Sequence, residues 1–141
     1  MTVMLSIRHQ PIRRKGREPH EEEQIEMRYL LLIANDESVL AAMSPEEGQA
    51  MMVGYGKFGD EMTARGVLQD GNRLRPTSDA TTVQVRNGEV LTADGPFAET
   101  KEQIGGYYVI DCEDLDEAIE VASKLPHATN GTIEVRPIWE M

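Results

Sequence analysis

The sequence predicts one α+β domain with an antiparallel sheet, and three observations support this fold class. Four short apolar stretches have the length of β-strands, two longer stretches carry apolar residues at helical spacing, and Asn87-Gly88 is the strongest short hairpin signal in the chain. The expected order is strand, helix, strand, hairpin, strand, helix, strand. Without the inserted hairpin this order is βαββαβ, the split βαβ pattern of ferredoxin-like folds. A chain of 141 residues normally forms one domain with a real core.

The expected strands differ in how clearly they are marked. Residues 29–33 form a continuous apolar run, which is typical of a strand buried on both faces. In residues 82–86, Val83 and Val85 alternate with polar residues and lead into the hairpin turn. Further strands are expected at 67–74, where Gly71 weakens the pattern, at 106–112, and at 132–139, where Pro137 suits an edge or a strand end.

Both expected helices have clear start signals. Ser44 can cap the first helix, because a proline follows it and Glu47 completes a capping box. The apolar stripe of this helix comprises Met51, Tyr55, Phe58 and Met62, and it ends near Gly66. Asp114 and Glu117 can cap the second helix, which Pro126 stops. One face of the second helix is expected to carry Leu115, Ala118, Ile119, Ala122 and Leu125.

Two helices cannot cover both faces of such a sheet. In small proteins of this pattern, the uncovered face is usually buried by a second copy that packs face to face. We therefore expect a two-fold homodimer that forms a dimeric α/β barrel. A cavity is then expected between the two sheets or between sheet and helices.

Composition excludes several classes of protein. Apolar residues make up 40% and charged residues 28% of the chain, and no window approaches the roughly 18–20 continuous apolar residues of a membrane helix. The N-terminus lacks the apolar core of a secretion signal. Cys112 is the single cysteine, and its acidic neighbours disfavour a reactive thiolate. These features indicate a cytoplasmic protein that does not bind membranes. No cofactor is indicated, because the chain lacks a metal-ligand spacing and a nucleotide-type glycine pattern.

Charge separates residues 1–26 from the rest of the chain. From Met27 onward there are 9 basic against 20 acidic residues, so the whole net charge of −11 lies in that part. A body this acidic repels phosphate backbones, which argues against binding to nucleic acid. We interpret residues 1–26 as a flexible N-terminal extension, with Met27 as a plausible start codon, and residues 27–141 as the folded domain.

Residues 91–108 contain the most specific pattern in the chain. Asp94 can accept backbone N–H bonds, Gly95 tolerates backbone angles closed to other residues, and Pro96 ends ladder pairing. A loop with such demanding residues often carries function. We therefore weigh two roles for Asp94: acid–base chemistry on a ligand, or formation of the turn alone.

This segment and two others resemble a known protein family. The matching residues are Asp94-Gly95-Pro96-Phe97-Ala98-Glu99-Thr100-Lys101-Glu102, Gly105-Gly106-Tyr107 and Glu134-Val135-Arg136-Pro137-Ile138. On these motifs the chain resembles the YCII-related, or DGPF, family over essentially everything except residues 1–26. The resemblance implies a ferredoxin-like, dimeric α/β-barrel protein of the bacterial cytoplasm. Some family members are fused to, or encoded beside, extracytoplasmic-function sigma factors, which implies a regulatory role for part of the family.

A histidine–aspartate pair suggested for other branches of the family is absent here, because no histidine lies between Met27 and Pro126. His127 is the one histidine of the folded domain. It could act as a general acid or base oriented by Asp94, or it could bond the free carbonyls at the end of the second helix.

Ligand contacts are expected from the motif and from the strand that follows it, namely from Pro96, Phe97, Lys101, Tyr107 and Tyr108. The two tyrosines must point to opposite sides of their strand, so at least one is expected to face a cavity or a partner subunit, with core packing as the alternative. Arg73 and Arg75 could bind a carboxylate or simply form a solvated face.

Three functions remain open at this point. The first is binding of a small molecule in the dimer cavity, without established catalysis. The second is a regulatory or partner-binding module that acts with a sigma factor. The third is a small acid–base enzyme that uses Asp94. The absence of the histidine–aspartate pair of other family branches favours binding over catalysis.

Overall fold

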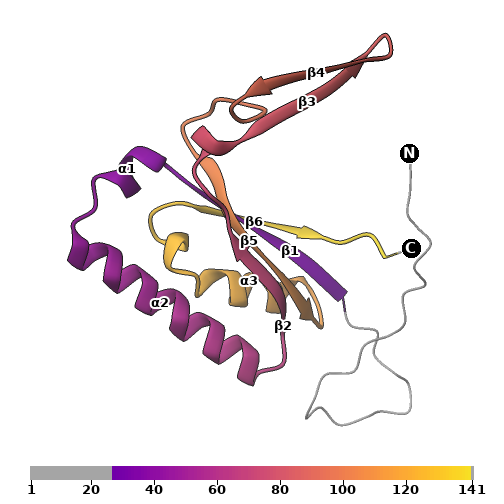
Figure 1. The fold of residues 1–141 in the computed structure, drawn as a ribbon. Coiled ribbons are helices and arrows are strands. Elements are labelled where there is room, and N and C mark those ends of the chain that lie inside the picture. Colours follow the sequence, from indigo (N-terminus) through magenta and orange to yellow (C-terminus); the bar gives the residue numbers. More distant parts are fainter. Residues whose placement is uncertain (1–26, 141) are drawn as a thin grey trace.

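A computed structural model of the protein describes residues 27–140 and confirms the α+β class (Figure 1). The expectations for residues 1–26 lie outside the described residues. The strands and helices in chain order are β1 (Met27–Asn35), α1 (Glu37–Ala41), α2 (Pro45–Ala64), β2 (Leu68–Arg73), the 3₁₀ turn η1 (Thr77–Asp79), β3 (Thr81–Arg86), β4 (Glu89–Asp94), β5 (Gln103–Cys112), α3 (Leu115–Ser123), the 3₁₀ turn η2 (Pro126–Ala128) and β6 (Thr132–Pro137).

Four strands form the main sheet, in the order β2-β5-β1-β6, and all neighbours are antiparallel. The first and third strands of the βαββαβ unit, β1 and β5, are therefore the two central strands of the sheet, as expected for a ferredoxin-like fold. Helices α2 and α3 lie on one face of the sheet (Figure 1). Within residues 27–140, no helix covers the other face.

The central strand β1 shows how the sequence divides between the two faces. Tyr29, Leu31 and Ile33 are buried beneath the helices, whereas Leu30 and Leu32 are only half-buried on the uncovered face. Burial on both faces was expected from the continuous apolar run. That expectation is wrong for the described chain, since the apolar even-numbered residues have no layer above them.

Helix α2 begins where the sequence predicts. The Ser44 hydroxyl accepts a hydrogen bond from the Glu47 amide at 3.1 Å, and the Glu47 carboxylate accepts one from the Ser44 amide at 2.9 Å. This reciprocal capping box satisfies two amides that a helix start leaves free. The predicted stripe is confirmed: Phe58 and Met62 are buried, and Met51 and Tyr55 are half-buried.

Helix α3 also has its predicted cap, because the Asp114 carboxylate accepts from the Glu117 amide at 2.9 Å. Its predicted face needs correction, since Leu115 and Ile119 are about half exposed. The buried face consists of Ala118, Val121, Ala122 and Leu125. The buried face of α3 therefore includes Val121 in place of Leu115 and Ile119. The small residues of this face allow α3 to lie close to the sheet.

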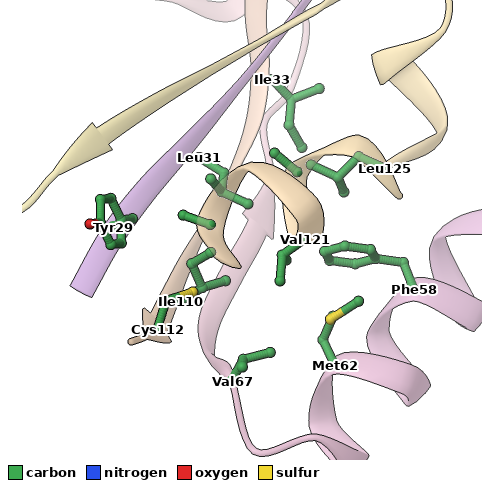
Figure 2. Packing of buried hydrophobic residues seen from close by; sticks show 12 residues of the cluster. Tyr29, Leu31, Ile33, Phe58, Met62, Val67, Ile110, Cys112, Val121 and Leu125 are labelled. Atoms are coloured by element: carbon green, nitrogen blue, oxygen red, sulfur yellow. The ribbon is translucent and has the colours of Figure 1, made fainter. Parts of the chain in front are cut away.

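The core lies between the two helices and the sheet (Figure 2). Its largest fully buried side chains, each less than 2% exposed, include Leu31, Met62, Val67, Ile110, Val121 and Leu125. Cys112 belongs to the same cluster, which fits the structural role expected for it.

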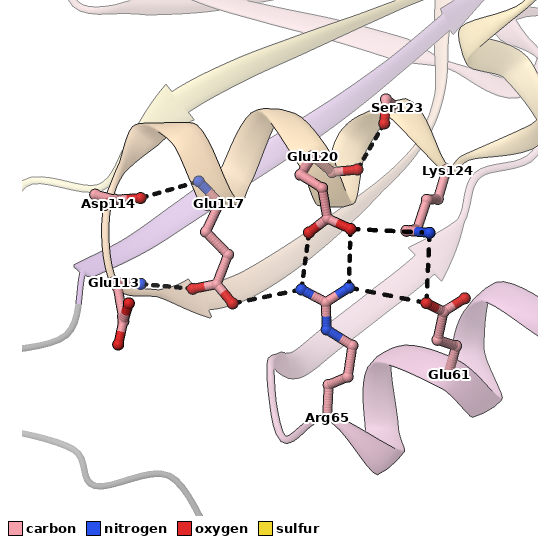
Figure 3. A network of polar contacts seen from close by, with 8 residues as sticks. All are labelled: Glu61, Arg65, Glu113, Asp114, Glu117, Glu120, Ser123 and Lys124. Carbon is pink, nitrogen blue, oxygen red and sulfur yellow. Dashed lines mark hydrogen bonds and ion pairs between the residues drawn. The ribbon is translucent and has the colours of Figure 1, made fainter. Parts of the chain in front are cut away.

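A polar network joins α2 to α3 at the edge of this core (Figure 3). Arg65 caps the end of α2 and reaches Glu120 with two nitrogens, at 2.8 and 3.1 Å. The hydrogen bonds to Glu120 raise the pKa of Arg65, and the same contact lowers the pKa of Glu120. Such solvent-exposed pairs contribute little individually, so the network orients the two helices more than it stabilises them.

The hairpin β3–β4 forms a separate two-stranded sheet and projects away from the helices (Figure 1). Its turn has the predicted geometry, with positive φ at Asn87 (52°) and Gly88 (78°). The base of the hairpin is tied to α1, because the Glu37 carboxylate accepts from the amide and the hydroxyl of Thr77. Sequence reasoning missed α1, whose five residues are too few to show a period.

Candidate functional site

The Asp94-Gly95-Pro96 segment closes the base of the hairpin. Asp94 is the last residue of β4, is exposed, and lies opposite Thr81. Gly95 has a φ of 101°, and its amide donates to the Ala80 carbonyl at 2.7 Å. Its carbonyl accepts from the Thr82 hydroxyl at 2.7 Å. The positive φ therefore requires a glycine at position 95, whereas the backbone at position 94 does not require an aspartate. The role of Asp94 in catalysis stays a prediction.

The loop after this segment is ordered by its own side chains. Gln103 donates to the carbonyls of Ala98 and Thr100, at 2.8 and 3.1 Å. Phe97 is 89% exposed, and Lys101 is exposed near the start of α1. Bonds from Ser38 hold the pKa of Asp36 below its usual value, and the charge of Lys101 acts in the same direction. Of the predicted ligand contacts in this loop, Phe97 and Lys101 face solvent within the single chain, whereas Pro96 is half-buried.

Tyr107 and Tyr108 point to opposite faces of β5, as predicted. The Tyr107 hydroxyl accepts from the Asn72 amide group at 2.9 Å on the face without helices. Tyr108 lies on the helix side, where its ring packs against Phe58 with 5.0 Å between ring centroids. Only Tyr108 therefore approaches the other candidate residues described below.

His127 is buried, with 6% of its surface exposed, and lies in the short turn η2 after α3. Its Nδ1 atom is 2.5 Å from the hydroxyl of Tyr55 on α2. The ring therefore bonds to Tyr55 and not to the helix carbonyls or to Asp94, the two partners considered from sequence. Gly54 permits this contact between α2 and η2, because a Cβ atom there would lie 3.2 Å from the Pro126 ring.

Burial keeps both members of this pair neutral. Burial raises the pKa of Tyr55 to about 12 and lowers the pKa of His127. The Nε2 atom of His127 is buried and has no hydrogen-bond partner among the described residues. An unpartnered buried nitrogen is costly, and His127 is one of three buried polar residues of the described chain, together with Asn35 and Asp111.

Two further residues extend the pair toward solvent. The ring of Tyr108 lies over Gly71 of β2, where a Cβ atom would be 2.3 Å from the ring. Arg73 follows two positions later on the same face of β2. Its positive charge lowers the pKa of both Tyr55 and His127, so it adds to the effect of burial on His127 and opposes that effect on Tyr55. Tyr55, Arg73, Tyr108 and His127 are called the tyrosine–histidine cluster below.

Sequence reasoning found three members of this cluster separately but did not join them. His127 and Tyr108 were expected at a site, and Arg73 was considered as a carboxylate contact. Tyr55 was interpreted only as part of the apolar stripe of α2. A tyrosine among apolar helix residues is a weak signal, since its hydroxyl needs a partner that only the fold supplies.

Comparison with known proteins identifies the family. The YCII-related domain matches residues 27–141, which is most of the chain. The chain belongs to the YCII-related family. An uncharacterised protein from Rhizobium meliloti (strain 1021) is 44% identical over 114 residues, which cover 79% of this chain and 92% of that protein.

Two kinds of feature are absent from the described part of this YCII-related domain. Within residues 27–140, no three or more histidine, cysteine, aspartate or glutamate side chains gather to hold a metal ion. None of the helices formed by the described residues is long and apolar enough to cross a membrane. The tyrosine–histidine cluster itself consists of two tyrosines, one histidine and one arginine.

The buried His127 of the YCII-related domain should make its stability depend on pH. Because the folded state lowers the pKa of His127 from 6.5, the unfolded chain binds a proton that the folded chain excludes. The stabilising contribution is complete above pH 6.5 and is lost as the pH falls through the interval below it. We expect His127→Gln to lose less stability between pH 7 and pH 5 than the unmodified protein, measured by urea unfolding at both values. Equal losses would show that His127 is not held neutral by burial.

Proposed function

We propose that this YCII-related protein binds a small molecule at the tyrosine–histidine cluster, and that it does so as a homodimer. The observation that carries the proposal is the pair formed by half-buried Tyr55 and buried His127, whose Nε2 atom lacks a partner among the described residues. Core positions normally hold apolar side chains, so a polar pair with an unmet hydrogen bond points to a function other than packing.

The chemistry of the pair favours binding over catalysis. Tyr55 has a raised pKa and gives up its proton poorly at neutral pH. If its hydroxyl donates to Nδ1 of His127, the neutral ring carries its proton on Nε2 and lacks a free basic nitrogen. In this arrangement the pair is a poor general base, and the Tyr55 oxygen keeps a lone pair that can accept a hydrogen bond from a ligand.

The homodimer is supported by the uncovered sheet face. Leu30, Leu32 and Val109 lie at its centre and are only half-buried. A contiguous apolar face of this kind marks an interaction surface, and a second copy would bury it symmetrically. Packing of two such sheets gives the dimeric α/β barrel expected from the family resemblance.

Native mass spectrometry of the purified full chain tests both parts of the proposal. We expect a dimer that carries a retained small molecule, which Tyr55→Phe releases. The matched control is Tyr107→Phe, the same change on the opposite face of the sheet, which should retain the ligand. A monomer at micromolar concentration would contradict the dimer.

Asp94→Asn separates the cluster from the alternative site in the motif loop. If catalysis or binding depends on Asp94, this variant and not Tyr55→Phe should lose the ligand. We expect Asp94→Asn to retain it, with the fold nearly intact. Loss of the ligand in Asp94→Asn alone would show that the site lies in the motif loop. It would then favour the acid–base enzyme that uses Asp94.

A partner-binding role is the second candidate, and the hairpin favours it. Val83, Val85 and Val90 lie on one face of the hairpin and are 57–68% exposed. Two-stranded hairpins are barely stable alone, so an exposed apolar face of this kind suits a protein partner. A sigma factor should then co-purify with the unmodified chain but not with Val85→Asp; repeated absence from pull-downs would exclude this role.

A further inference from the structure

Arg73 differs from most other arginines of the domain in lacking an acidic partner. Arg28, Arg65, Arg75 and Arg136 each form an ion pair with a glutamate or an aspartate. Among residues 27–140, no such pair involves Arg73, although this part of the chain has 20 acidic residues. A cation left unpaired in so acidic a protein is available for an external anion.

Arg73 lies on the same face of the sheet as Tyr108, and its charge acts on Tyr55 and His127. Arg73 lies opposite Gly106 on β5, and Gly71 lies opposite Tyr108, so both β2 residues share the face that α2 covers. Gly106 is buried and has no side chain to separate Arg73 from the helix layer. Arg73 therefore lies on edge strand β2, at the solvent-exposed side of the cluster. The buried His127 lies at the inner side of the cluster.

The 2.5 Å contact between Tyr55 and His127 can be made in two ways. Either the phenol O–H donates to Nδ1 and the ring proton lies on Nε2, or Nδ1–H donates to the phenol oxygen. In the second arrangement the Tyr55 O–H is free to donate elsewhere. The net charge is the same in both, because Nε2 releases its proton to water while Nδ1 takes one up from water.

We propose that Arg73, Tyr55 and Tyr108 bind a carboxylate group of the ligand, and that His127 changes tautomer when the carboxylate arrives. The guanidinium supplies the charge, the two phenols donate hydrogen bonds, and Nδ1–H of His127 supports the Tyr55 oxygen from behind. A monovalent carboxylate suits the site better than a phosphate, since one arginine in a protein of net charge −11 offsets only one negative charge. This inference rests on the proposed function and adds the ligand class to it.

The test uses the full chain labelled with ¹⁵N-histidine, with His127→Gln to assign the ring signals. Benzoate is the carboxylate probe, benzamide is its neutral counterpart of similar size, and phenyl phosphate tests the other oxyanion. We expect benzoate to bind saturably and to move the ¹⁵N-H signal of His127 from Nε2 to Nδ1. Arg73→Gln should weaken benzoate binding about tenfold or more, the factor expected when a charged hydrogen bond is lost.

Arg75→Gln is the matched control, because it removes the same charge two residues away. Arg75 is paired with Asp79 at 2.8 Å and is fully outside the cluster, so this variant should bind benzoate as the unmodified protein does. Equal weakening in both variants would show that benzoate binding depends only on the net charge of the protein, and this would overturn the proposed site.

The other outcomes separate this inference from the proposed function. If benzamide binds as tightly as benzoate, a small-molecule site exists but the carboxylate class is wrong. If phenyl phosphate binds more tightly than benzoate, the class is phosphate. If benzoate binds without a change of tautomer, the role of His127 is wrong. If no probe binds while Tyr55→Phe still releases the retained ligand, the proposed function stands and the inference fails.

Discussion

Leu31→Ala is expected to lower the free energy of unfolding by about 3–4 kcal/mol. Leu31 lies at the centre of β1 and is 0% exposed among the core residues drawn in Figure 2. Its truncation removes buried apolar surface and leaves a cavity between two helices and a sheet. These elements cannot move freely to fill the cavity. Urea unfolding monitored by circular dichroism would measure the loss.

Leu30→Ala provides the matched control, because it is the same change at the adjacent position on the other face. Leu30 is half-buried and lacks a covering layer in the described chain. At low protein concentration we expect it to cost about 1 kcal/mol. If both variants cost the same, the assignment of the two faces of β1 is wrong.

Gly131→Ala is expected to destabilise the protein by about 2–3 kcal/mol through overpacking. A Cβ atom at this position would lie 2.4 Å from the Ala34 carbonyl oxygen and 3.2 Å from that of His127. Both neighbours are backbone atoms, so β6 or η2 would have to move. Movement of η2 displaces His127, and the variant should therefore lose the Tyr55 contact as well as stability. Thermal unfolding and the ¹⁵N signals of His127 would report the two effects.

Gly56→Ala is the corresponding control within α2. No atom lies within 4 Å of a Cβ placed at Gly56, and alanine is a better helix former than glycine. This variant should gain about 0.5–1 kcal/mol of stability. A loss at Gly56 similar to that at Gly131 would mean that the cost arises from glycine removal in general and not from the contact with Ala34.

Local chemistry explains why much of the fold could be predicted from sequence. The cap of α2 depends on Ser44 and Glu47, which are three residues apart, and the hairpin turn depends on two adjacent residues. Such signals are complete within a few positions. The buried face of α3 was predicted less well, because Ile119 and Val121 have similar apolarity and only the sheet decides which of them is buried.

The candidate site could not be predicted because its contacts join residues distant in sequence. Tyr55 and His127 are 72 positions apart, and neither residue has a neighbour in sequence that indicates the other. Likewise, only the structure shows that no acidic side chain among residues 27–140 forms an ion pair with Arg73. The Asp94–Lys101 motif, in contrast, was easy to identify and identifies the family, but all its side chains except that of half-buried Pro96 are exposed in the described chain.

The projecting hairpin has a consequence for how the domain responds to stress. Its strands pair only with each other among the described residues, so they can open without exposing Leu31 or its neighbours. We therefore expect the hairpin to open at a lower free energy than the core. Two connections join it to the main sheet, the Asp94-Gly95-Pro96 segment on one side and residues 74–80 on the other. A protein partner that binds the hairpin would thus act on an arm whose opening costs the domain little of its core.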